Sequence, residues 1–101
     1  MSQVAIIAKF TALSGQRAPL AAALQAALDT AEKEPGTRFY ILHEDSANAD
    51  VLVMYEMYEN QEALAAHGSS EAFKALGPII RPFTASRPEI TMAKPIGGKG
   101  L

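Results

Sequence analysis

Two side chains in this sequence are well suited to proton transfer, His67 and Glu56. The imidazole of a histidine titrates near neutral pH, so His67 can accept the proton of a phenolic hydroxyl. Glu56 interrupts an otherwise apolar strand pattern, where burial would raise its pKa and an ion pair with His67 or Arg38 would lower it. We therefore predict that His67 acts as a catalytic base with the help of Glu56.

Each of these two residues also has a structural interpretation. His67 can bond a carbonyl at the Gly68 break and fix the end of its helix, since buried polar groups are normally satisfied. Glu56 can orient His67 or form a bridge to a neighbouring strand. The sequence leaves both interpretations open.

Aromatic and apolar residues near these two are candidates for lining an apolar ligand pocket. Tyr40 and Tyr58 can bind a ligand hydroxyl at one end of such a pocket, although aromatic residues in strands are more often part of the core. Met54, Leu64 and Phe73 are the predicted wall residues.

The chain offers little for a metal or an organic cofactor. It has no cysteine, and its two histidines, His43 and His67, stand in unrelated positions, which makes a poor ligand set. His43 ends its strand beside a polar loop and is expected to be solvated. No GxGxxG or phosphate-binding loop occurs, so flavin and nicotinamide have no sequence support. We expect no cofactor.

Composition favours a single small globular domain. The chain has 101 residues, of which 49% are hydrophobic, and a formal net charge of −2 without a Lys/Arg cluster. Nucleic acid and anionic membranes are therefore not expected as partners. Nothing is long enough to span a bilayer, and no signal peptide is recognisable, so a cytoplasmic location is the default. We expect one domain over residues 1–96 and a flexible, glycine-rich tail over residues 97–101.

Alternation and helical periodicity predict a β-α-β-β-α-β order. The strands are expected at residues 4–13, 37–43, 51–59 and 89–96, and the helices at residues 19–33, 60–67 and 70–77. Asn60 and Ser70 are predicted N-caps, and Gly77-Pro78 is predicted to end the last helix. Residues 79–88 are predicted to be a packed connection. This order indicates an α+β, ferredoxin-like antiparallel sheet with its helices on one face.

Such a sheet leaves one apolar face without cover. On the strand at 51–59, Glu56 and Tyr58 are expected to face the helices, whereas Val53 and Tyr55 face outward. On the other strands the outward face would carry either Val4, Ile6 and Phe10 with Phe39 and Ile41, or the residues opposite to these. A second copy is the simplest cover, so we predict a homodimer.

The order of short motifs resembles the antibiotic biosynthesis monooxygenase (ABM) family over roughly the first 95 residues. The matching pieces are Glu34-Pro-Gly36 followed by Tyr40, then Asp45, the VMYEMY strand, and Ala66-His67 with Ser70 and Phe73. The resemblance implies a dimeric α/β-barrel built from two ferredoxin-like halves. Its members include cofactor-free oxygenases of quinols and aromatic polyketides, haem-degrading oxygenases and isomerases.

The haem-degrading branch fits this sequence poorly. That branch places an Asn, a Trp and an iron-ligating His where this chain has about Ala8, Met57 and Gly77, and the chain has no Trp at all. The resemblance therefore implies a cofactor-independent monooxygenase that acts with O2 on a small phenolic or quinol-type substrate. A non-catalytic, small-ligand-binding dimer and a cofactor-free isomerase are the alternatives.

Overall fold

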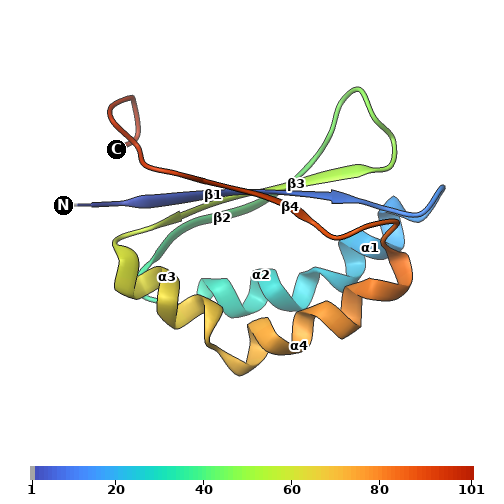
Figure 1. Ribbon diagram of the computed structural model, residues 1–101, viewed down its shortest axis with the longest axis horizontal. Helices are drawn as coiled ribbons and strands as arrows, with labels where there is room; N and C mark the ends of the chain where they lie inside the picture. Colours follow the sequence, from blue (N-terminus) through green and yellow to red (C-terminus); the bar gives the residue numbers. More distant parts are fainter. Residues whose placement is uncertain (1) are drawn as a thin grey trace.

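A computed structural model describes residues 2–101, and its elements follow the predicted order (Figure 1). The strands are β1 (Val4–Thr11), β2 (Thr37–Glu44), β3 (Val51–Tyr58) and β4 (Glu89–Ala93). The helices are α1 (Arg17–Ala23), α2 (Gln25–Glu32), α3 (Gln61–Gly68) and α4 (Glu71–Ile80), followed by the short 3-10 helix η1 (Arg81–Phe83). The single helix predicted for residues 19–33 is therefore two consecutive helices that meet at Leu24.

The strands form one antiparallel sheet in the order β2-β3-β1-β4, with the helices on one side of it (Figure 1). The predicted α+β, ferredoxin-like fold is confirmed. The two central strands, β1 and β3, are adjacent although they are the first and third in the chain. This arrangement brings the centre of β3 under the helix layer, where the candidate site lies.

The predicted faces of β3 are also confirmed. Its helix-facing residues Leu52, Met54, Glu56 and Tyr58 are all buried. Their partners on the neighbouring strand β1 are Phe10, Ala8, Ile6 and Val4, respectively. On β1 these residues therefore face the helices, and the opposite set, with Ile7, lies on the outer face.

The outer face of the sheet is apolar and partly exposed. Ile7 and Ile41 flank Tyr55 across the strands, and Ile7, Phe39 and Ile41 are 38%, 36% and 47% exposed. No element of residues 2–101 covers this face (Figure 1).

Both predicted side-chain caps are present. Asn60 Oδ1 accepts a hydrogen bond from the backbone N–H of Ala63 at 2.8 Å, and Ser70 Oγ accepts one from the N–H of Phe73 at 3.1 Å. These bonds satisfy backbone donors at the first turns of α3 and α4.

The predicted end of α4 at Gly77-Pro78 was wrong, because the helix continues to Ile80 with Pro78 inside it. Leu76 and Ile80 are four residues apart, share one helix face and are both buried in the core. We attribute the extension to this burial, which offsets the backbone hydrogen bond that proline cannot donate. The last strand ends at Ala93 rather than at residue 96, two residues before Pro95.

The core lies between the sheet and the helices α1, α2 and α4. Leu20 and Leu24 are fully buried in it. No helix within residues 2–101 is both long and apolar enough to cross a lipid bilayer.

Candidate active site

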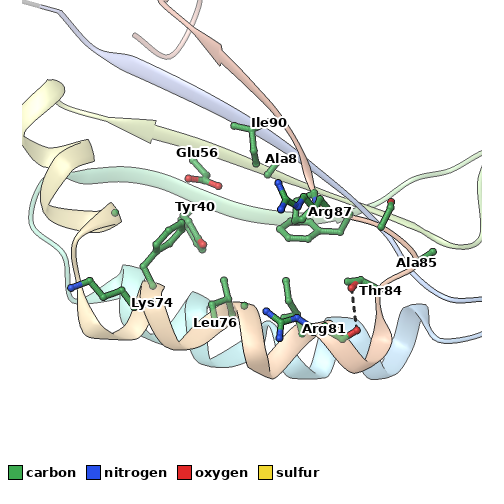
Figure 2. Close-up of a pocket in the computed structure, with 17 residues that line it drawn as sticks. Ala8, Tyr40, Glu56, Lys74, Leu76, Arg81, Thr84, Ala85, Arg87 and Ile90 are labelled. Carbon is green, nitrogen blue, oxygen red and sulfur yellow. Dashed lines mark hydrogen bonds between the residues drawn. The ribbon is translucent and has the colours of Figure 1, made fainter.

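A cavity of about 780 Å³ opens between the sheet and α4 (Figure 2). Ala8, Phe10 and Glu56 line it from the sheet, and Phe73, Leu76 and Ile80 line it from α4. Its volume lies in the range of pockets that hold small organic ligands, which are mostly apolar with a few polar groups.

Glu56 and Tyr40 are the polar groups that the two neighbouring strands β3 and β2 direct into this cavity (Figure 2). Glu56 is only 7% exposed. Its Oε1 accepts a 2.6 Å hydrogen bond from the hydroxyl of Tyr58, which is fully buried. No buried side-chain nitrogen or oxygen within residues 2–101 lacks a partner, so the unbonded Oε2 of Glu56 must be accessible from the cavity.

Burial raises the pKa of Glu56. The hydrogen bond from Tyr58 and the charge of His67 lower that pKa, and the charge of Glu34 raises it, but burial dominates. Burial also raises the pKa of Tyr58 and of Tyr40, and the neighbouring carboxylates add to both shifts. Both phenols therefore stay protonated at neutral pH, and Glu56 is the proton acceptor of this group.

His67 has a different partner from those predicted. Its Nδ1 lies 2.9 Å from Oε1 and 3.2 Å from Oε2 of Glu34. It forms no hydrogen bond through its side chain with Glu56, with Tyr58 or with a carbonyl at Gly68. Glu56 likewise has no ion pair with Arg38 within the described residues.

Aromatic rings surround His67 and separate it from the cavity. Ring centroids of Tyr40, Tyr58 and Phe73 lie 5.4, 5.2 and 5.3 Å from that of His67. Tyr40, Phe73 and Leu76 line the large cavity on one side and a small space of about 10 Å³ beside His67 on the other. His67 therefore lies behind the cavity wall, whereas Glu56 lies within it.

Sequence reasoning recognised Glu34 only as part of the Glu34-Pro-Gly36 motif, without a partner for its carboxylate. In the fold, its carboxylate accepts hydrogen bonds from the hydroxyl of Thr37 at 2.9 Å and bonds His67 as described. Gly36 permits this contact, because a Cβ there would lie 2.5 Å from the Cβ of Ala63 in α3. The close approach of α3 to the turn before β2 brings His67 to Glu34, and the Glu34-Pro-Gly36 motif was the available signal.

The predicted wall residues are only partly brought together. Phe73 lines the cavity and is 47% exposed. Met54 is fully buried in the core and Leu64 is half-buried, and neither lines the cavity. Sequence reasoning missed Arg81 and Arg87, which line it from the segment between α4 and β4.

The described residues hold no evident metal site. No group of three or more histidine, aspartate or glutamate side chains within residues 2–101 has an arrangement that could hold a metal ion. His43 is exposed at the far end of β2, with Nδ1 3.3 Å from the carbonyl oxygen of Val53.

Comparison with known proteins places this geometry in a family. The family model described as antibiotic biosynthesis monooxygenase matches residues 3–77. A comparison with curated proteins finds no match.

Solved structures with the same fold span nearly the whole chain. Rv0793 from Mycobacterium tuberculosis is 29% identical, with a TM-score of 0.88 and coverage of 98% of this chain and 100% of its own. A candidate antibiotic biosynthesis monooxygenase from Caulobacter crescentus CB15 is 25% identical, with a TM-score of 0.86 and coverage of 95% and 92%. Another from Chloroflexus aurantiacus J-10-fl is 28% identical, with a TM-score of 0.80 and coverage of 98% of both chains.

Proposed function

We propose that this chain, which belongs to the antibiotic biosynthesis monooxygenase family, is a cofactor-free monooxygenase of a small phenolic or quinol-type aromatic substrate. One observation carries the proposal. A buried carboxylate with a raised pKa, Glu56, presents one unbonded oxygen to an apolar cavity of about 780 Å³. A base of this kind can take the proton of an aromatic hydroxyl that is bound in the cavity.

The reaction needs no external reductant. A phenol with a free para position reacts with O2 to give a para-quinone and water, so that 1-naphthol gives 1,4-naphthoquinone. One oxygen atom forms the new carbonyl, and the other leaves as water with the hydrogens of the hydroxyl and of the ring carbon. All four electrons come from the substrate. The protein supplies proton removal and orientation.

We assign the base to Glu56 rather than to His67, because Glu56 lines the cavity and His67 lies behind its wall. Tyr58 holds the carboxylate through the 2.6 Å bond, and Tyr40 can donate a hydrogen bond to the substrate oxygen. Glu34 and His67 act as positioning residues, since their charges reach Glu56 without touching the cavity.

The proposal includes a homodimer in which a second copy covers the outer face of the sheet. The partly exposed Ile7, Phe39 and Ile41 on that face support it, since burial of apolar surface favours association. Sedimentation of the chain at micromolar concentration, compared with that of Ile41→Lys, tests the interface. The cytoplasmic location is a prediction that cell fractionation would test.

Oxygen uptake with 1-naphthol and with hydroquinones tests the proposed activity. We expect one O2 consumed for each naphthoquinone formed, without hydrogen peroxide. Binding of 1-naphthol without oxygen uptake would favour the ligand-binding alternative, and conversion of a substrate without O2 would favour an isomerase. Either result would refute the oxygenase proposal.

A further inference from the structure

The large cavity gathers positive charge that the proposed oxidation does not use. Lys74, Arg81 and Arg87 line it, whereas Glu56 is the only acidic residue among residues 2–101 that does. The chain as a whole carries a formal net charge of −2. Positive side chains therefore collect at this opening against the overall sign of the protein, and such a cleft concentrates anionic ligands.

The two arginines are free to bind a ligand. Lys74 is paired with Glu71 at 3.6 Å on the surface of α4. In contrast, the guanidinium groups of Arg81 and Arg87 have no ion pair and donate no hydrogen bond within residues 2–101. Both side chains are exposed to solvent, so water solvates their charges when no ligand is bound.

The backbone around the two arginines is held in place. The carbonyl oxygen of Arg81 accepts hydrogen bonds from the N–H and the hydroxyl of Thr84, at 3.3 and 3.2 Å. The N–H of Ala85 donates to the carbonyl of Thr11 in β1 at 2.9 Å. Figure 2 shows Arg81 on the side of α4 and Arg87 on the side of the sheet, across the opening from each other.

From this arrangement we infer that the ligand of the cavity is an aromatic acid, whose carboxylate is held by Arg81 and Arg87. A guanidinium presents paired N–H donors that match the two oxygens of a carboxylate. Tyr40 and Glu56 lie toward the opposite end of the cavity from Thr84 and Ala85 (Figure 2).

The charges that line the cavity also orient the ligand. The carboxylate is attracted by the arginines and repelled by Glu56, so the hydroxyl end turns toward Glu56 and Tyr40. The placement of the ligand hydroxyl beside Glu56 rests on the proposed function, whereas the placement of the carboxylate rests on the two arginines alone.

Two naphthols test the assignment. The pair is 5-hydroxy-2-naphthoate, which has its hydroxyl and carboxylate on different rings, and 1-naphthol, which lacks the carboxylate. Calorimetric titration of the whole chain under nitrogen should show the acid binding at least about tenfold more tightly, as expected for charge-assisted hydrogen bonds. High salt should reduce that preference, because both arginines are exposed and screened.

Arg81→Gln and Arg87→Gln should each remove most of the preference for the acid over 1-naphthol. Arg38→Gln is the matched control, because it makes the same change of charge at an exposed arginine that does not line the cavity. Equal affinities for the two naphthols, or the same loss in Arg38→Gln, would overturn the assignment.

The two proposals fail separately. Tight binding of the acid without oxygen uptake would refute the oxygenase and support the arginine site. Oxygen uptake with 1-naphthol, together with equal affinities for the two naphthols, would support the oxygenase and refute the arginine site.

Discussion

Removal of one hydroxyl, in Tyr58→Phe, tests the electrostatics of the candidate site. The bond from Tyr58 to Glu56 is 2.6 Å long, and both residues are buried. A hydrogen bond to a charged acceptor contributes about 1.5–3 kcal/mol, and a neutral one contributes about 0.5–1.5 kcal/mol. We therefore expect the substitution to lower the free energy of unfolding by about 1.5–3 kcal/mol where Glu56 is ionised, and by less where it is protonated.

The pH dependence has a defined sign. Because the pKa of Glu56 is raised in the fold, the folded state binds this proton more tightly than the unfolded state. The stability gained in this way is fully present below the unfolded value of 4.5 and is lost as the pH rises through the folded pKa. Tyr58→Phe removes a bond that lowers this pKa, so stability should fall with rising pH over a wider range than in the parent.

Urea unfolding at about pH 8 and near the unfolded pKa measures both effects. Tyr55→Phe is the matched control, because it removes the same atom on the outer face, where the hydroxyl has no hydrogen-bond partner within the described residues. In a Glu56→Gln background, the loss caused by Tyr58→Phe should shrink to the neutral-bond value at both pH values. An equal loss at both pH values in the parent background would refute the reasoning.

Three further predictions follow from the surroundings of Glu56. Glu34→Gln should move the acidic limb of the pH–activity profile to lower pH and His67→Gln should move it to higher pH, because the charges of the two residues act on the pKa of Glu56 in opposite directions; shifts in the same direction would contradict this. Gly36→Ala should cost about 1–3 kcal/mol by overpacking against Ala63 in α3, and Ala63→Gly should restore most of that stability in urea unfolding. Phe73→Ala should speed the modification of His67 by diethyl pyrocarbonate and leave the exposed His43 unchanged, because Phe73 is part of the wall between His67 and the cavity; an unchanged rate for His67 would place the wall elsewhere.

Much of the fold followed from local patterns. Alternation on β3 identified which of its residues face the helices, and the capping side chains of Asn60 and Ser70 marked where α3 and α4 begin. These signals are local and are read over a few residues. The extension of α4 past Pro78 was missed, because it depends on the burial of Ile80 in the core and not on helix propensity.

The candidate site was predicted less completely. Glu56, Tyr58 and His67 do come together, because strand alternation and the start of α3 place them on one side of the sheet. The pairing of His67 with Glu34 joins residues 33 positions apart and depends on the close approach at Gly36, which no periodicity encodes. Arg81 and Arg87 lie in a proline-containing segment without a repeating pattern, so only the folded chain shows that both line the cavity.

The pH profile of kcat/KM for oxygen uptake with 1-naphthol, in the parent and in Glu56→Gln, tests the central claim most directly. The parent rate should rise with pH as the carboxylate of Glu56 loses its proton, with a midpoint above 4.5. Glu56→Gln should lower the rate by about a hundredfold or more and abolish this limb, while His67→Gln keeps it. A Glu56→Gln variant with the parent rate and profile would contradict the assignment of Glu56 as the base.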